Sequence, residues 1–176
     1  MTQQEKDEIV QEVLKKLREP VDLPIEVLEG AHLPFYAHKG DAGLDIRANA
    51  DVIIKPMKTI IVPTGIKLAI PEGYEVQMRP RSGISAKTPL SVALGTIDSG
   101  YHNELGVIIT NYSPEGSKEE CTIEDKHKFG IYNIKKGDRI AQIVFVKYTV
   151  ANLKLCENID CFETDREGGF GTSGVK

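Results

Sequence analysis

The sequence predicts an all-β sandwich or barrel that forms a single domain. After Pro20, short β-like runs alternate with turns that contain glycine or proline, and no long helical pattern separates them. The chain has 176 residues, of which 40% are hydrophobic, so a core of ordinary size can form. A short helix at the N-terminus is the exception to the β pattern.

That helix is predicted over residues 2–19. Thr2 and Glu5 have the spacing of a capping box, and Pro20 ends the helical pattern. The apolar residues of the segment fall on one stripe: Ile9, Val10, Val13, Leu14 and Leu17. We expect this stripe to pack on the same subunit, with contact to a partner protein as the alternative.

The β-like runs follow in order along the chain. They are short and rich in β-branched residues, as is typical of partly buried strands. They cover residues 25–28, 52–54, 59–62, 66–70, 74–78, 105–110, 131–134 and 140–150. Turns with glycine are predicted at residues 63–65, 71–73 and 135–138, and a polar loop at 113–128.

Composition excludes several classes of function. The net charge of -4 provides no broad basic surface, so we expect no nucleic-acid partner. The longest apolar runs are too short to span a membrane, and the charged N-terminus lacks the apolar region of a secretory signal. Three cysteines without a CxxC pair argue against a disulfide scaffold or zinc site and favour a cytoplasmic location. The four histidines have no ligand-like spacing and are expected at the surface.

Two segments have residue types that suit a phosphate group. In residues 81–83, Arg81 offers forked donors, Ser82 a hydroxyl and Gly83 close backbone approach, although an ordinary turn is the alternative. The glycine-rich tail, residues 166–176, combines an arginine, a phenylalanine and two hydroxyl residues. Such a tail can close over a flat, anionic ligand such as a nucleotide, and a solvated terminus is the alternative.

Three further segments place polar side chains near predicted strands. Residues 94–101 run into a bend with Asp98 and Tyr101, and we expect a hairpin whose returning strand starts near Glu104. Asp98 suits a general base and Tyr101 a platform for a ring or sugar, with a local turn role as the alternative.

An acid in residues 41–46 suits hydrated Mg²⁺, which prefers few protein ligands, with a solvated acid as the alternative. Gln142 lies in the strongest apolar strand and can face a ligand. Asp138 and Arg139, just before it, are expected to stabilise a turn.

Taken in order, five segments resemble the trimeric dUTP pyrophosphatase (dUTPase) family, from about Ile25 to Gly174. They are residues 41–46, 80–87, 95–101, 136–143 and the tail. Each is weak alone, but five in order are highly specific. The resemblance implies a distorted jelly-roll or β-barrel fold of the dUTPase type. It also implies a homotrimer with active sites between subunits and Mg²⁺-dependent hydrolysis of dUTP to dUMP and pyrophosphate.

The resemblance also implies a role for each site residue. Asp98 would activate the water that attacks the α-phosphorus, and Asp45 would hold the hydration shell of Mg²⁺. Phosphates would be bound by Arg81, Ser82, Gly83 and Gln142, and by Arg166 of the tail. Uracil would pair with main-chain groups around Thr96, Ile97 and Gly106, with Tyr101 against the sugar. Phe170, followed by Gly171 and Thr172, would cover the base.

The chain departs from the family pattern in two informative places. Gly100 stands where the family usually has Asp, and the tail is one residue shorter between Arg166 and its paired glycines. Gly100 also matches the related dCTP deaminases, but the position of their catalytic Glu is Ile108 here, which cannot transfer protons. A non-enzymatic trimer that binds protein partners is the second alternative.

The expected organisation has three parts. An amphipathic helix occupies residues 1–20, a dUTPase-like β domain residues 21–160, and a flexible glycine-rich arm residues 161–176.

Overall fold

The structure is a computed structural model that describes residues 2–18 and 20–159. The tail residues Arg166, Phe170, Gly171 and Thr172 lie outside the described residues. The elements are α1 (Gln3–Arg18), β1 (Ile25–Val27), β2 (Gly43–Arg47), β3 (Val52–Ile54), β4 (Thr59–Pro63), β5 (Ile66–Leu68), β6 (Tyr74–Arg79), α2 (Ser82–Lys87), β7 (Leu90–Val92), β8 (Gly95–Ile97), β9 (Gly106–Asn111), β10 (Glu120–Cys121), β11 (Ile131–Ile134) and β12 (Arg139–Lys147).

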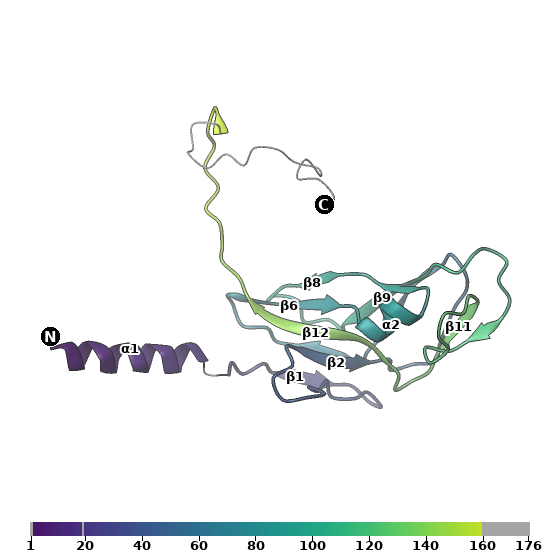
Figure 1. Ribbon diagram of the computed structural model, residues 1–176, viewed down its shortest axis with the longest axis horizontal. Helices are drawn as coiled ribbons and strands as arrows, with labels where there is room; N and C mark the ends of the chain where they lie inside the picture. Colours follow the sequence, from purple (N-terminus) through teal and green to yellow (C-terminus); the bar gives the residue numbers. More distant parts are fainter. Residues whose placement is uncertain (1, 19, 160–176) are drawn as a thin grey trace, which may run out of the picture.

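The strands form four small sheets that stack into an elongated body (Figure 1). The largest has the order β2-β12-β6-β8, and the others are β4-β9-β7, β10-β11-β3 and β1-β5. All named strand pairs are antiparallel except β10–β11. The all-β prediction with a short N-terminal helix is confirmed. The described strands form open sheets of the jelly-roll kind and do not close into a barrel.

The core lies between the inner faces of these sheets. In β9, Val107 and Ile109 are fully buried while Ile108 between them is 43% exposed, as the two-residue period of a strand requires. β12 instead buries consecutive residues, Ile140 and Ala141, at its start. Because consecutive residues point to opposite faces, both faces of β12 are covered at this point, and its two edges pair with β2 and β6.

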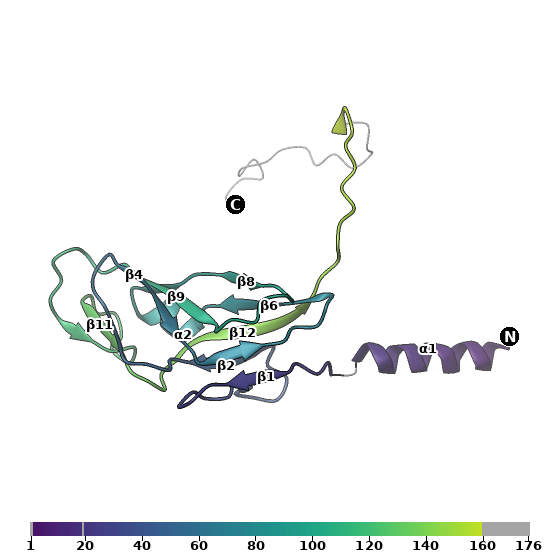
Figure 2. The same ribbon diagram turned by 180° about the vertical axis from the view of Figure 1, so that it is seen from behind.

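The N-terminal helix forms as predicted but does not pack as predicted. The Glu5 N–H donates to Thr2 Oγ1 (3.2 Å) and the Thr2 N–H to Glu5 Oε2 (2.6 Å), which confirms the capping box. Ile9 and Val10, however, are each 51% exposed. Both views show α1 projecting from the body beyond β1 (Figures 1 and 2). The expected packing of these two residues on the same subunit is therefore wrong, because no sheet face lies beneath them.

The predicted hairpin around Asp98 is also wrong. β8 pairs with β6, with Thr96 opposite Gln77, whereas β9 pairs with β4 and β7. The turn after β8, in which the Tyr101 N–H donates to the Asp98 carbonyl (3.0 Å), carries the chain from one sheet to the other. β8 and β9 are adjacent in sequence but belong to two different sheets. The helix α2 and the short strand β7 were not expected either.

The polar loop near residues 113–128 contains only the two-residue β10 and is fixed at its base by Asn111. The fully buried Asn111 amide donates to the Ile54 and Gly130 carbonyls, each at 2.8 Å, and accepts the Ser113 N–H at 2.9 Å. Near its end, the His127 N–H donates to the Lys87 carbonyl of α2 at 2.6 Å. The loop is thus held against α2.

Beyond β12 the chain leaves the body (Figure 1). Leu153 and Leu155 in this segment are more than 90% exposed. All four histidines are exposed, as expected. Neither of the helices that the structure describes is long and apolar enough to cross a membrane.

Candidate active site

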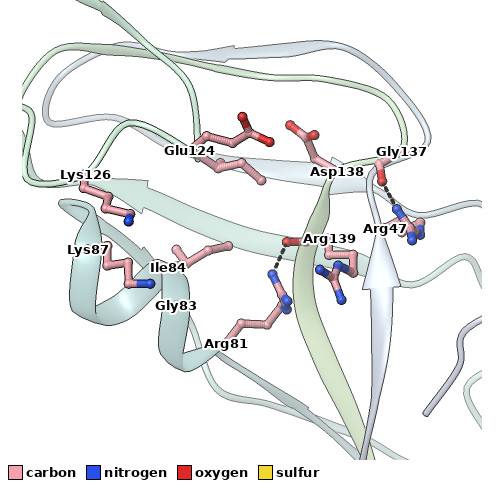
Figure 3. A pocket seen from close by; sticks show the side chains of 11 residues that line it. Arg47, Arg81, Gly83, Ile84, Lys87, Glu124, Lys126, Gly137, Asp138 and Arg139 are labelled. Carbon is pink, nitrogen blue, oxygen red and sulfur yellow. Dashed lines mark hydrogen bonds between the residues drawn. The ribbon is translucent and has the colours of Figure 1, made fainter. Parts of the chain in front are cut away.

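One cavity, of about 420 Å³, has five cationic side chains in its lining, and we name it the cationic cavity. It lies between α2, the loop after β10 and the start of β12 (Figure 3). Its lining residues are Arg47, Arg81, Gly83, Ile84, Lys87, Ile123, Glu124, Lys126, Gly137, Asp138 and Arg139. Five cations face two carboxylates, so the cavity suits an anionic ligand.

Asp45 holds two of these arginines in place. Its Oδ1 accepts Arg81 Nε and its Oδ2 accepts Arg139 Nη1, both at 2.9 Å. The Arg81 Nη1 also donates to the Arg139 carbonyl at 3.0 Å. Asp45 is only 8% exposed, whereas the Arg81 and Arg139 side chains are 24% and 42% exposed, so the carboxylate is buried and the arginines reach solvent. Two of the five N–H donors of Arg81 are used among the described groups, and the others are available to a phosphate.

The strand register explains how these side chains meet. β2 and β12 are antiparallel with Asp45 opposite Gln142, and a β-bulge lies between Arg139 and Ala141. A bulge bends the strand and redirects its side chains, which brings Arg139 to Asp45. Gly43 lies beside them, and a Cβ added there would meet the Gln142 side-chain oxygen, so a larger residue would displace the end of that side chain.

The other predicted phosphate ligands lie next to this cluster. Gln142 Nε2 donates to the Pro80 carbonyl at 2.9 Å, which places the amide beside the segment that leads into Arg81. Ser82 and Gly83 begin α2 and are exposed. A Cβ added at Gly83 would meet no described heavy atom within 4 Å, so the backbone there faces open space.

A second cavity, of about 220 Å³, lies at the turn between β8 and β9, and we name it the turn cavity. Its lining residues are Met78, Gly95, Thr96, Ile97, Asp98, Tyr101, Leu105, Gly106 and Ile108. Tyr101 is fixed there by a hydrogen bond from its hydroxyl to the Glu104 carbonyl (3.1 Å). Gly106 is confined, because a Cβ would collide with the Ile61 side chain.

Asp98 is the acid of the turn cavity. It is exposed, and no described side chain pairs with its carboxylate. Ile108, at the position where a deaminase would carry its Glu, lines the same cavity. Asp98 is therefore the only acid among the described residues that line this cavity.

The two cavities share no lining residue. The structure brings Arg81 and Asp45 together in one group, with Ser82, Gly83 and Gln142 nearby, and Asp98 with Thr96, Ile97, Tyr101 and Gly106 in another. A single chain thus presents the predicted phosphate ligands and the predicted base in separate places.

The described donor set contains no cage of protein ligands for Mg²⁺. Within residues 2–18 and 20–159 no three His, Cys, Asp or Glu side chains gather as a metal cage. Both oxygens of Asp45 accept guanidinium groups, but each carboxylate oxygen has a second lone pair that can accept a metal-bound water. Mg²⁺ keeps several waters and few protein ligands. The residues fit an ion held by ligand phosphates, with water between it and Asp45.

The loop that borders the cationic cavity is ordered by charge. Asp125 accepts the N–H and the hydroxyl of Thr122 at 2.8 and 3.0 Å, and these bonds hold the pKa of its carboxyl below the ordinary value. Lys128 pairs with Glu119 (2.8 Å) and Asp125 (3.3 Å), which raises the pKa of Lys128 to about 12. The loop therefore keeps its charges at neutral pH.

Sequence reasoning missed four cations of the cationic cavity. Arg139 was expected to stabilise a turn, but it pairs with Asp45, while Asp138 does hold the turn by accepting the Lys135 N–H at 2.8 Å. Arg47 directly follows the predicted segment 41–46 and Lys87 ends the segment 80–87, so their positions in the sequence could have indicated a place near the phosphate ligands. Lys126 lies in the polar loop, and nothing in the sequence pattern indicated that it would reach the cavity.

Comparisons with known proteins identify the family of the chain. The dUTPase family model matches residues 29–174. A deoxyuridine 5'-triphosphate nucleotidohydrolase of Fusobacterium nucleatum is 42% identical over 150 residues, which are 83% of this chain and 92% of that protein. The Staphylococcus bacteriophage 80alpha dUTPase with dUPNHPP is 35% identical, with a TM-score of 0.79 over 89% of this chain and 100% of that one.

A second solved structure concerns a metal. It is a mutant dUTPase from phage phi11 of S. aureus, described for its coordination of a structural Mg(II) ion. It is 33% identical, with a TM-score of 0.73 over 80% of this chain and 99% of that one. With a family model that covers most of its length and curated relatives at this identity, the chain belongs to the dUTPase family.

Proposed function

We propose that this chain hydrolyses dUTP to dUMP and pyrophosphate in the presence of Mg²⁺. The observation that supports this is the division of the predicted residues between two cavities. One carries a free carboxylate beside exposed main-chain groups, and the other carries guanidinium groups fixed by Asp45. A nucleotide needs both kinds of surface, one for its base and sugar and one for its phosphates.

In the proposed reaction Asp98 accepts a proton from a water molecule whose oxygen attacks the α-phosphorus. The bond from the α-phosphorus to the oxygen that bridges to the β-phosphorus breaks, and pyrophosphate leaves with that oxygen. Such general-base assistance is typically worth about 10²–10⁴-fold in rate. Arg81 and Gln142 position the phosphates and neutralise charge that develops on them.

Mg²⁺ would be held by the phosphates, with water between it and Asp45. When bound, such an ion neutralises charge on phosphate oxygens. Its requirement in this chain is part of the proposal, supported by the donor set and by the metal in the related phage phi11 structure.

Base selection follows from the main chain at the turn cavity. Backbone groups around Thr96, Ile97 and Gly106 can pair with O2, N3–H and O4 of uracil. Cytosine presents an amino donor where uracil presents O4, which would leave buried polar groups unpaired at roughly 1–3 kcal/mol each. Tyr101, fixed by its bond to Glu104, can pack on the sugar and exclude a ribose 2′-hydroxyl.

The separation of the two cavities supports sites shared between subunits of a homotrimer. The outer face of the β4–β9 pair offers an apolar contact surface, since Ile61 and Ile108 lie opposite each other and are 67% and 43% exposed. Assembly through apolar surface of this kind would bring the turn cavity of one chain to the cationic cavity of the next.

The test is pyrophosphate release with Mg²⁺ from dUTP, dCTP, dTTP and UTP, together with the Asp98→Asn variant. We expect turnover of dUTP alone, and a variant that binds a non-hydrolysable dUTP analogue yet loses at least about a hundredfold in kcat. Turnover of dUTP by Asp98→Asn at the parent rate would refute the mechanism. Release of ammonia from dCTP would support the deaminase alternative.

A further inference from the structure

Lys87 and Lys126 enter the cationic cavity from the side opposite the arginines. Lys87 ends α2 and Lys126 lies in the loop after β10, and both side chains reach toward the cavity (Figure 3). Arg81 and Arg139 face it from the other side (Figure 3). The cavity therefore has cations on two walls, which exceeds what one phosphate group requires.

These lysines differ from the arginines in having no partner of their own. Among the described residues, neither ammonium group forms an ion pair or a hydrogen bond, whereas Arg81 and Arg139 both bind Asp45. Of the two carboxylates that line the cavity, Asp138 already accepts the Lys135 N–H. Unpaired ammonium groups that converge on one cavity favour an external anion.

The backbone contacts show that the position of Lys126 is fixed and not accidental. The loop is tied at its base by the buried Asn111, and its end is tied to α2 by the bond from the His127 N–H to the Lys87 carbonyl. His127 adopts a positive φ of 59°, an uncommon backbone conformation for a residue other than glycine. The residue next to Lys126 is thus bonded to Lys87 itself.

We propose that Lys87 and Lys126 form an anion subsite for the diphosphate end of the nucleotide and for the pyrophosphate released from it. The proposal rests on the proposed function for the identity of this ligand. Pyrophosphate carries several negative charges over two phosphorus centres, which matches cations on two facing walls. Ammonium groups on flexible stems bind phosphate as point charges, so the same pair can follow the product as it leaves.

The experiment is calorimetric titration of the full-length chain with inorganic pyrophosphate and, separately, with dUMP. The variants are Lys87→Gln, Lys126→Gln and the double variant. Lys118→Gln is the matched control, because Lys118 is exposed on the same loop and does not line the cavity. Each single variant should weaken pyrophosphate binding roughly tenfold, and dUMP binding should change less than about twofold. Lys126→Arg should restore most of the affinity.

The outcomes separate this proposal from the proposed function. Equal pyrophosphate affinity in the double variant and in Lys118→Gln, or no measurable binding by the parent chain, would overturn the subsite. If pyrophosphate binding depends on the lysines while dUTP is not hydrolysed, the subsite stands and the proposed function fails. If dUTP is hydrolysed and its KM is unaffected in the double variant, the subsite fails alone.

Discussion

Asp45 lies almost buried between two guanidinium groups, and its replacement tests what that arrangement contributes. In Asp45→Asn the amide keeps one acceptor oxygen but turns an NH₂ group toward the second arginine. The substitution leaves two arginines without their carboxylate, but their side chains are 24% and 42% exposed, so water solvates part of the uncompensated charge. We therefore expect the free energy of unfolding to fall by about 1 kcal/mol. Urea unfolding at fixed protein concentration measures this.

Asp51→Asn is the control for that measurement. Asp51 is exposed and accepts bonds from Lys135 Nζ (3.2 Å) and the Lys136 N–H (2.8 Å). Solvent screens such contacts, so Asp51→Asn should change stability much less than Asp45→Asn. Equal effects of the two substitutions would show that burial gives the Asp45 pairs no special weight.

Tyr132 provides a prediction for alkaline pH. Its ring is fully buried and its hydroxyl donates to the Lys128 carbonyl at 3.0 Å. Burial, with nearby acids, raises the pKa of Tyr132 from 10.0 to about 12. Above pH 10 the unfolded chain therefore loses the phenol proton first, and stability falls as pH rises toward 12, by at most roughly 2–3 kcal/mol.

Tyr132→Phe removes the titrating group, so the unfolding free energy should decline less between pH 10 and 12 in this variant. Loss of the hydrogen bond should lower its stability slightly at pH 8. Lys128, with its pKa near 12, causes a separate loss that both proteins share. The measurement is urea unfolding at pH 8, 10 and 11.5, with Tyr148→Phe as the control. Parallel pH curves for Tyr132→Phe and the parent chain would contradict the assignment.

At the level of single residues, the resemblance predicted a phosphate-binding set of Arg81, Ser82, Gly83 and Gln142. The structure places these residues near one another, and their role stays a prediction. The clamp of Asp45 on Arg81 and Arg139 was not predicted, because it depends on a bulge in β12 that local sequence does not reveal.

Among the elements, the loop near residues 113–128 depends most visibly on a single side chain. In Asn111→Ala, the carbonyls of Ile54 and Gly130 and the N–H of Ser113 all lose their partner in a buried position. Each unsatisfied group costs about 1–3 kcal/mol, and water entry offsets part of this, so we expect a loss of about 2–4 kcal/mol.

The Asn111→Ala variant should also show faster amide hydrogen exchange at residues 113–130 and weaker pyrophosphate binding, because Lys126 would no longer be held beside Lys87. Asn133→Ala in β11 is the matched control, since Asn133 is only partly buried. Unchanged exchange across the loop in Asn111→Ala would show that the loop is held by other contacts.

Element boundaries were predictable where the apolar pattern is strong. β3 and β11 match their predicted ranges, and the capping box fixed the start of α1. The prediction of a hairpin at Asp98 was wrong because strand pairing depends on residues far apart in the sequence. Adjacent strands usually pair, but partners are decided by distant residues, here Gln77 for Thr96 and Ile61 for Ile108. The packing of α1 failed because an amphipathic stripe does not identify its partner.

At the scale of the whole molecule, the two cavities share no lining residue, and we propose that the cavities serving one substrate come from different chains. Arg81→Ala and Asp98→Asn should each be inactive alone. If the chain forms the proposed homotrimer, the two proteins unfolded together at equal amounts and refolded will mix at random in each trimer. A site that takes Asp98 from one chain and Arg81 from its neighbour is then intact in about one quarter of cases.

The mixture should therefore recover about 25% of the parent dUTP turnover, whereas sites contained in one chain would recover none. Single variants refolded alone are the controls, and sedimentation must show the same oligomer in all samples. A further test is Ile61→Glu introduced into both variants. Ile61 is 67% exposed on the apolar face proposed for subunit contact, so a charge there should separate the subunits and abolish the recovered activity. If intact mixed trimers recover almost no dUTP turnover, Asp98 and Arg81 of one chain act together. The turn cavity and the cationic cavity would then have to approach each other within a single subunit.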